Sequence, residues 1–228
     1  MIERGLNTEQ HAAAGQYVSF LYNQGGVLVK WFRNTFAAAE RLQAQASGQD
    51  LYPALLAEMP ADLSRVMVLP HFTATGPPKF ITDSSGVMVG LKLETTRGEI
   101  LKGLIEAMTF YTRATFETLP GVGIHVADFR AVGGGSKSDA WIQISADILG
   151  RPFIRPKISE AGVLGAAILA GVGCGVFPSL EDGVQSMVQL DRTFEPDPQK
   201  QALYNERFGK YQRLGPLMAD YLRDLEEK

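Results

Sequence analysis

The stretch Phe129-Arg-Ala-Val-Gly-Gly-Gly-Ser-Lys-Ser-Asp-Ala-Trp-Ile-Gln143 joins a short apolar run, three successive glycines and an amphipathic pattern. This order predicts a strand, a tight turn over 133–136 and a helix capped by Ser138 or Asp139. Successive glycines let a ligand come close to the backbone, and free amides at a helix start favour an anion or the polar edge of a nucleotide. A plain turn between two core elements fits the same residues equally well, so both interpretations stay open at this point.

Two common nucleotide-binding motifs are excluded by their spacing. A P-loop needs Gly-x-x-x-x-Gly-Lys-Ser/Thr, whereas Ser136 separates Gly135 from Lys137, so Lys137 is expected to be a solvated surface residue. The dinucleotide fingerprint Gly-x-Gly-x-x-Gly is also missing, because Gly171-Val-Gly-Cys-Gly175 has the wrong spacing and follows a helical pattern. An NAD-dependent enzyme is therefore disfavoured.

Apolar periodicity and turn residues outside this stretch predict alternating helices and strands. Helices are expected over 26–45, 52–58, from 96 with a Thr96-x-x-Glu99 capping box, over 138–149, after Ser179 and over the last thirty residues. Strands are expected over 66–69, 87–93, 129–132 and 153–155, and a loop over 71–85. This mixed order predicts an α/β fold in which a mixed sheet is flanked by helices.

Residues 161–177 carry no charge, which makes them a candidate for a membrane-spanning helix. Five glycines dilute the run, so a buried, tightly packed helix capped by Ser159 is the better prediction, with Cys174 as a small core residue. Small residues that allow close helix packing there are Gly162, Gly165 and Ala166.

The composition is that of one globular domain: 228 residues, 45% hydrophobic and 21% charged, with a formal net charge of -3. No basic stripe suggests nucleic acid or a membrane surface as a partner. Cys174 is the only cysteine, which excludes an internal disulfide and a cysteine-based metal cluster and favours a reducing compartment. Residues 1–15 show no signal peptide, so we expect a cytoplasmic protein. His11, His71 and His125 have no ligand spacing and are interpreted as ordinary histidines.

The opening stretch, together with Asp147-Ile-Leu-Gly-Arg-Pro152 and Glu160-Ala-Gly-Val-Leu-Gly-Ala-Ala-Ile-Leu-Ala-Gly171, resembles the C-terminal domain of FGGY carbohydrate kinases of the xylulokinase type. Two further segments are also similar to this family: Val18-Ser-Phe-Leu-Tyr-Asn-Gln-Gly-Gly-Val-Leu-Val-Lys-Trp-Phe-Arg33, and Gly90-Leu-Lys-Leu-Glu-Thr-Thr-Arg97 with Glu106 in the helix that follows. The resemblance covers nearly the whole chain from about Gly15.

This resemblance implies an actin-like ATPase (ribonuclease H-like) domain, with residues 1–228 as the nucleotide-binding half and a sugar-binding N-terminal domain outside them. It implies ATP and Mg²⁺ as cofactors and a sugar or polyol as phosphate acceptor. The family's nucleotide contacts fall on Gly26, Lys30, Gly134 and Ser138, while Gly133 and Gly135 shape the turn. Lys30 departs from the neutral polar residue of relatives and is also interpreted as an exposed lysine.

The family's catalytic base is an aspartate directly after a glycine, upstream of a Gly-Thr phosphate loop, and this chain contains neither pair. Asp128 and Asp139 are interpreted as a loop residue and a helix cap, so no residue is assigned as catalytic or as a metal ligand. We expect Met1 to lie downstream of that loop and the isolated chain to be an inactive fragment that self-associates, giving a possible homo-oligomer. The alternative is a non-catalytic actin-like module that binds a nucleotide or a protein.

Overall fold

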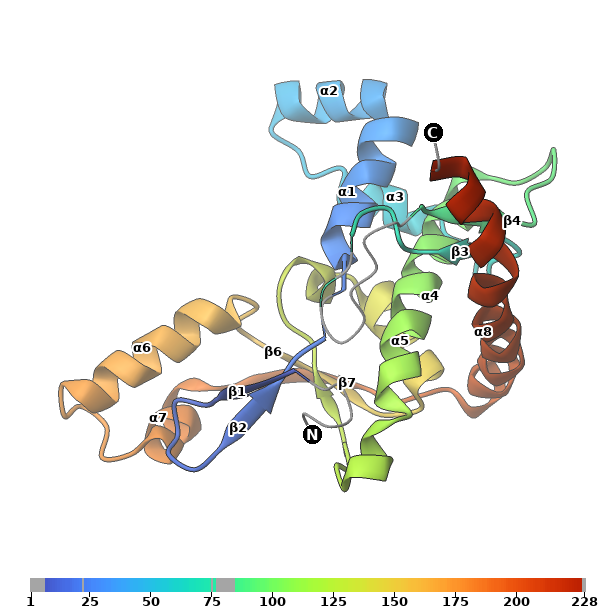
Figure 1. The fold of residues 1–228 in the computed structure, drawn as a ribbon. Coiled ribbons are helices and arrows are strands. Elements are labelled where there is room, and N and C mark those ends of the chain that lie inside the picture. The colour runs from blue at the N-terminus through green and yellow to red at the C-terminus, as the bar shows by residue number, and fades with distance from the viewer. Residues whose placement is uncertain (1–6, 22, 75, 77–84, 227–228) are drawn as a thin grey trace.

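A computed structural model describes residues 7–21, 23–74, 76 and 85–226. Figure 1 shows a long helix, α4, with β3 and β4 to its right and β1, β2 and β6 to its left. The helices are α1 (Gly25–Phe36), α2 (Ala38–Ser47), α3 (Tyr52–Ala57), α4 (Arg97–Phe116), α5 (Asp139–Leu149), α6 (Ala161–Gly173), α7 (Leu180–Met187) and α8 (Pro198–Glu226), with short 3₁₀ turns η2 (Leu119–Val122) and η3 (Gly134–Lys137).

The described strands form three small sheets. They are β1 (Thr8–Gln10), β2 (Tyr17–Ser19), β3 (Met67–Leu69), β4 (Val87–Val89), β5 (Phe129–Arg130), β6 (Phe153–Pro156) and β7 (Leu190–Phe194). The pairs β1–β2 and β3–β4 are antiparallel, while β6 pairs in parallel with β5 and antiparallel with β7. The α/β class with a mixed sheet and flanking helices is therefore confirmed, with β5–α5–β6 as its parallel unit.

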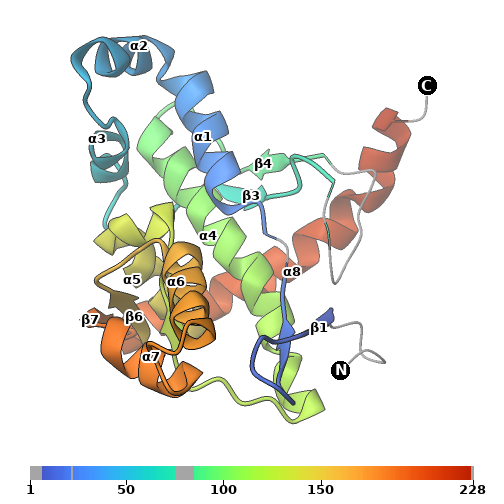
Figure 2. The ribbon, with the colours of Figure 1, turned by 90° about the vertical axis from the view of Figure 1, so that its left-hand side faces the viewer.

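Helix α4 lies at the centre of the main hydrophobic core. Thr96 and Glu99 form the predicted capping box, and the helix is buried from Gly98 to Tyr111 apart from Ile100. Its first turn lies against the backbone before β3, since a Cβ added at Gly98 would come within 2.0 Å of Glu58 O. The core around it joins residues of α1, α3, β3, α5 and α8. Figure 2 shows α8 crossing behind α4 at a steep angle.

The single helix expected over 26–45 is wrong, because the chain breaks between α1 and α2. Ala37 has φ -140° and ψ 39° and is fully buried. The strand expected over 87–93 is shorter for a local reason. Gly90 has φ +87°, and a Cβ there would lie 2.8 Å from Arg65 O, so the chain turns away after Val89.

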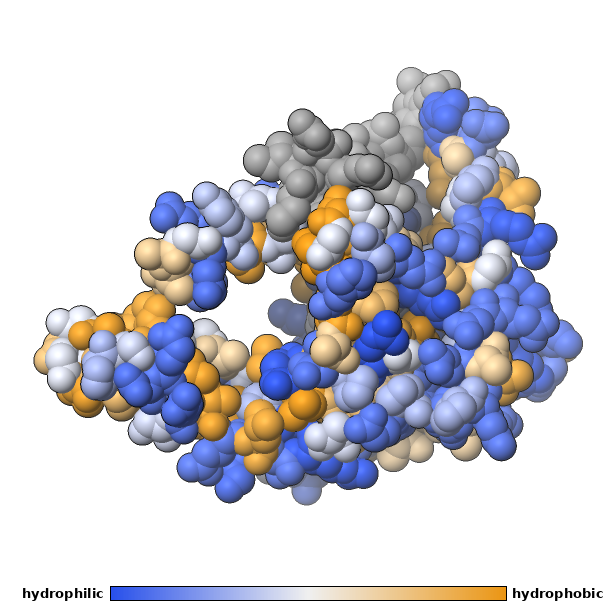
Figure 3. Space-filling model, turned by 90° about the horizontal axis from the view of Figure 1, so that it is seen from below, coloured by the Kyte–Doolittle hydropathy of each residue, from blue (hydrophilic) through white to orange (hydrophobic). Residues whose placement is uncertain are grey.

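The prediction of a buried helix over 161–177 is also wrong. Only Ile168 of α6 is buried, and Val163, Leu169 and Cys174 are exposed. Burial of a helix that is apolar all round needs neighbours on every side, and α7 covers one side only. Figure 3 shows apolar side chains on the surface of this projecting arm of the molecule.

Close packing does occur between α6 and α7, but not at Gly162, Gly165 or Ala166. A Cβ at Gly183 would lie 2.7 Å from Ile168 Cγ2, whereas Gly162 and Gly165 face open space. Ser159 does not cap α6, because Glu160 occupies the N-cap position without a side-chain bond. Ser179 caps α7 as expected.

The loop expected over 71–85 and the first six residues lie largely outside the described residues. Among those described, no helix is long and apolar enough to cross a membrane.

Candidate functional site

The glycine turn follows β5 and leads into α5, as the sequence predicts. Gly133 has φ +76° and ψ -168°, a conformation open to glycine, and its N–H donates to Ser159 O at 2.8 Å. The Ser136 hydroxyl donates to Gly133 O at 2.7 Å and closes the turn from inside. Ser138 is the N-cap of α5, because its Oγ accepts from Trp141 N at 3.2 Å. The turn is thus held by bonds of Ser136 and Ser138 within the segment and by one bond from Gly133 to Ser159.

Gly134 and Gly135 differ in what surrounds them. A Cβ at Gly135 would touch the Trp141 ring at 3.5 Å, which is ordinary van der Waals contact. A Cβ at Gly134 would have no neighbour within 4 Å, and its φ is not positive. Gly134 therefore presents bare backbone to open space without being needed for the turn.

The start of α1 is fixed by side chains of the residues before it. Asn23 Nδ2 donates to Met108 O of α4 at 2.8 Å, and Gln24 Nε2 donates to Thr73 O at 2.7 Å. Gln24 is only 6% exposed, and its Oε1 has no hydrogen-bond partner within the described part of the chain. Such a buried, orphaned acceptor fits a polar ligand at this point.

Helix α1 contacts η3, so the two segments predicted to bind a nucleotide lie side by side. Gly26, like Gly134, has nothing within 4 Å of an added Cβ. Lys30 is exposed one helical turn further on, so it extends the same face of α1. The structure thus places α1, which carries Gly26 and Lys30, in contact with η3, which contains Gly134 and Gly135 and is flanked by Gly133 and Ser138.

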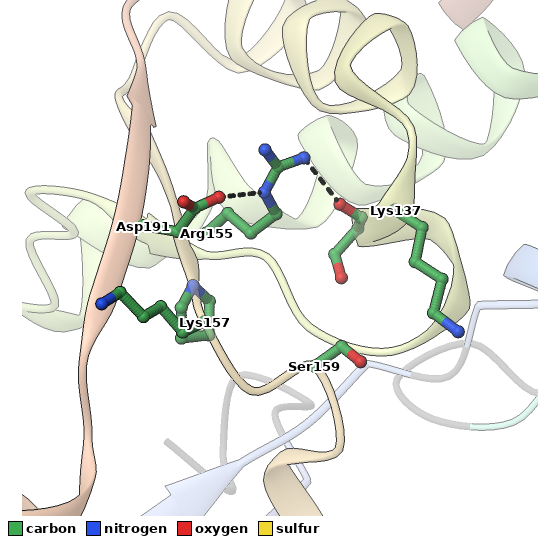
Figure 4. Close-up of a pocket in the computed structure, with 7 residues that line it drawn as sticks. Lys137, Arg155, Lys157, Ser159 and Asp191 are labelled. Carbon is green, nitrogen blue, oxygen red and sulfur yellow. Dashed lines mark hydrogen bonds and ion pairs between the residues drawn. The ribbon is translucent and has the colours of Figure 1, made fainter.

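A cavity of about 440 Å³ adjoins the turn at the carboxyl ends of β5 and β6, the edge where ligands commonly bind in α/β sheets. Arg155 spans it, with ion pairs to Asp139 at 2.6 Å and Asp191 at 2.9 Å. The hydrogen bonds that Arg155 donates to these carboxylates, first to Asp139 and then to Asp191, raise the pKa of Arg155. In Figure 4 the ammonium groups of Lys137 and Lys157 extend to opposite sides of this cavity.

None of the six predicted site residues lines this cavity, although Ser136 and Lys137 of the same turn do. Sequence reasoning missed Arg155, Lys157 and Asp191, which line it together with Pro156 and Ser159. The available signal was the basic pair formed by Arg155, the last residue of a predicted strand, and Lys157 shortly after it. Asp139 is not the cap of α5 but lies in its first turn, where it pairs with Arg155 and with Arg192.

Comparison with known proteins identifies the class of the chain. A family model described as the FGGY family of carbohydrate kinases, C-terminal domain, matches residues 7–174. The chain therefore belongs to the FGGY family of carbohydrate kinases, and its fold is the actin-like ATPase fold of that family.

Individual relatives agree with this assignment. The chain is 32% identical over 213 residues to a glycerol kinase from Acidovorax sp. (strain JS42), covering 88% of this chain and 40% of the relative. It is 33% identical over 196 residues to an autoinducer-2 kinase from Escherichia coli (strain K12), covering 82% and 36%. The crystal structure of xylulose kinase from Rhodospirillum rubrum superposes with a TM-score of 0.75 at 27% identity, over 96% of this chain and 43% of that one. The chain thus spans well under half the length of these relatives.

Proposed function

We propose that this chain is the ATP-binding half of a carbohydrate kinase and that the nucleotide lies across the glycine turn and the start of α1. One observation carries the proposal: Gly26 and Gly134 present open backbone in two segments that contact each other. Backbone without side chains lets a flat or charged ligand come close. The kinase family of the chain makes ATP the expected ligand.

The turn residues divide into two roles in this proposal. Gly133 and Gly135 shape the turn, while Gly134 contacts the nucleotide through its backbone. The Ser138 hydroxyl accepts from Trp141 N, which leaves its O–H free to donate to the ligand. Lys30 and Lys137 are exposed cations on either side and attract the phosphates.

Mg²⁺ belongs to the same proposal, bound to the phosphates of the nucleotide. No group of three or more His, Cys, Asp or Glu among the described residues forms a metal site of its own. The ion would neutralise charge on the phosphoryl group being transferred. The chain's own contribution is to bind and orient the nucleotide.

The reaction proposed for the parent protein is transfer of the ATP γ-phosphate to a hydroxyl of a sugar or polyol, as the names of the kinase relatives suggest. No Gly-Asp pair occurs in the 228 residues, so we assign the base and the sugar-binding surface to an N-terminal domain outside them. Residues 1–228 would then be one domain without transferase activity. Phosphorylation of glycerol or xylulose by the pure chain, above a buffer control, would overturn this part.

We also propose that the isolated chain self-associates and that the protein is cytoplasmic. The exposed apolar face of α6 favours association of the isolated chain with itself, which gives a homo-oligomer. The thiol of Cys174 is exposed and unpaired, which fits the reducing cytoplasm.

The glycine turn is tested by Gly134→Val with Gly121→Val as the matched control. Both glycines lie in one-turn 3₁₀ segments, have no positive φ and face open space, so the two variants should fold alike. Titration calorimetry with ATP should give a dissociation constant on the order of a millimolar for the parent and Gly121→Val. Binding should vanish in Gly134→Val and in Gly26→Val. A folded Gly134→Val that binds ATP like the parent would show that this glycine is no nucleotide contact.

A further inference from the structure

A second cavity, of about 200 Å³, lies away from the glycine turn. It is formed by the segment after α3, by α4, α5 and the first turns of α8. Apolar side chains and the Tyr204 ring make up much of its wall. Its polar groups are Lys102, Gln143, Asp147 and Lys200.

The two lysines of this cavity are held very differently. Lys102 is 4% exposed and donates to Pro60 O at 2.8 Å and Ala61 O at 3.1 Å, so two of its three N–H donors are used. Lys200 is half-buried, and its ammonium group makes no hydrogen bond or ion pair with any described residue. Burial lowers the pKa of Lys102, and repulsion from Lys200 acts in the same direction. Two cations therefore share one small space.

A single carboxylate lines the cavity beside these two cations. Asp147 is 1% exposed, and its Oδ1 already accepts from Asp197 N at 2.8 Å and from Gln143 Nε2 at 2.7 Å. Asp62 and Glu106 act on Lys102 electrostatically but do not line the cavity. Its wall thus carries one positive charge in excess, and of its two lysines only the half-buried Lys200 lacks a partner for its ammonium group among the described residues.

The size of the cavity limits what can neutralise that charge. Sites for drug-sized ligands and cofactors measure about 300–1,000 Å³, so a nucleotide does not fit here. The volume equals about seven water molecules, each taking ~30 Å³. We propose that this cavity binds a small oxyanion, the phosphate or carboxylate group of a metabolite of a few carbons, between Lys102 and Lys200.

An anion at this position would connect elements that are distant in the sequence. Lys200 lies in the first turn of α8, and Lys102 belongs to α4. Asp147 and Gln143 belong to α5, the helix that Ser138 of the glycine turn caps. Charged hydrogen bonds from both lysines would hold α8 against α4 beside α5. The site would therefore stabilise the chain when it is occupied.

The test is binding of inorganic phosphate and of acetate to the 228-residue chain, by calorimetry and by thermal unfolding at matched ionic strength. Phosphate also stabilises proteins without binding to a site, so saturation is the criterion. We expect saturable binding of at least one of the two anions, with a dissociation constant on the order of a millimolar. Binding of phosphate alone would indicate a phosphate site, and binding of acetate alone would indicate a carboxylate site.

Lys200→Gln removes the unpaired ammonium group without removing a hydrogen bond, so the variant should fold. Thermal unfolding of the variant in a chloride buffer checks this. The dissociation constant should rise about tenfold or more, as expected for loss of a charged donor. Lys210→Gln, an exposed lysine of the same helix, should leave it unchanged. Lys137 lines the other cavity, so Lys137→Gln shows whether the anion binds there instead. The proposal is wrong if neither anion saturates, if Lys200→Gln binds like the parent, or if Lys137→Gln alone loses binding.

Discussion

Glu106 is a carboxyl group in the core of the chain, at 1% exposure. Its Oε1 accepts from Ser64 N and from the Tyr204 hydroxyl, both at 3.0 Å, while Arg207 Nε lies 3.7 Å from Oε2. Burial raises the pKa of Glu106 to about 7, although the Ser64, Arg207 and Tyr204 contacts act in the opposite direction. Desolvation outweighs these contacts because Oε2 accepts no hydrogen bond from any described group.

This carboxyl should make the stability of the chain depend on pH. Between the unfolded value near 4.5 and about 7 the folded chain binds more protons than the unfolded chain, so the stabilising contribution of Glu106 is lost as pH rises. Glu106→Gln keeps an acceptor for Ser64 and Tyr204 and does not titrate. The difference in free energy of unfolding should shift in favour of the variant by up to about 3 kcal/mol across this window. Urea unfolding at several pH values measures it, and a constant difference would contradict the assignment.

At the scale of elements, Arg97 explains the break that periodicity did not predict. The first residue of α4 donates through Nη1 to Phe36 O, at the end of α1, at 3.2 Å and to Glu40 of α2 at 2.5 Å. Its other nitrogens bind both oxygens of Glu58, each at 2.7 Å. Hydrogen bonds to Glu58 and then Glu40 raise the pKa of Arg97. One guanidinium thus connects the starts and ends of four helices.

Removing this guanidinium should loosen α2 first, because none of its residues is buried. For Arg97→Gln we expect a loss of about 1 kcal/mol in the local opening free energy, since partly exposed ion pairs contribute little. Amide exchange in α2 would then be roughly fivefold faster. Arg113→Gln, which removes an ion pair at the other end of α4, is the control and should leave α2 unchanged. Equal exchange in α2 of Arg97→Gln and the parent would contradict this role.

Helix-capping residues and turn glycines predicted the positions of helix starts and of the glycine turn, because these signals depend only on residues close in the sequence. Thr96 with Glu99, Ser138, Ser179 and the glycine turn were all predicted from neighbouring residues. The break at Ala37 could not be predicted, because it depends on Arg97, sixty residues away. Strand β7 and the cavity residues Arg155 and Asp191 were missed for the same reason, since pairing between distant segments creates them.

At the scale of the whole molecule, α6 is the main departure from expectation. Its composition indicates a buried helix, yet Val163 is 72% and Leu169 47% exposed, and Val176 just beyond it is 68% exposed. Apolar surface of this kind marks an interaction site or favours association. The sequence resemblance placed the chain in the correct family. It could not show which faces of the described residues are exposed to solvent.

This face should make the isolated chain self-associate at high concentration. The double variant Val163→Glu, Leu169→Glu should shift sedimentation velocity profiles toward the monomer, because charges in an apolar interface are costly. Leu217→Glu, at an exposed position of α8, adds charge elsewhere and should not. A parent chain that stays monomeric at high concentration would rule out association through α6.

The central claim is that the glycine turn and the start of α1 bind ATP together. The most direct measurement is an ATP titration followed by amide chemical shifts of the ¹⁵N-labelled chain. The largest changes should occur at Gly26, Lys30 and residues 133–138, because α1 and η3 contact each other, while Gly121 and Gly123 at η2 stay unperturbed. Saturating changes confined to other parts of the chain, with the turn and α1 unaffected, would contradict the account.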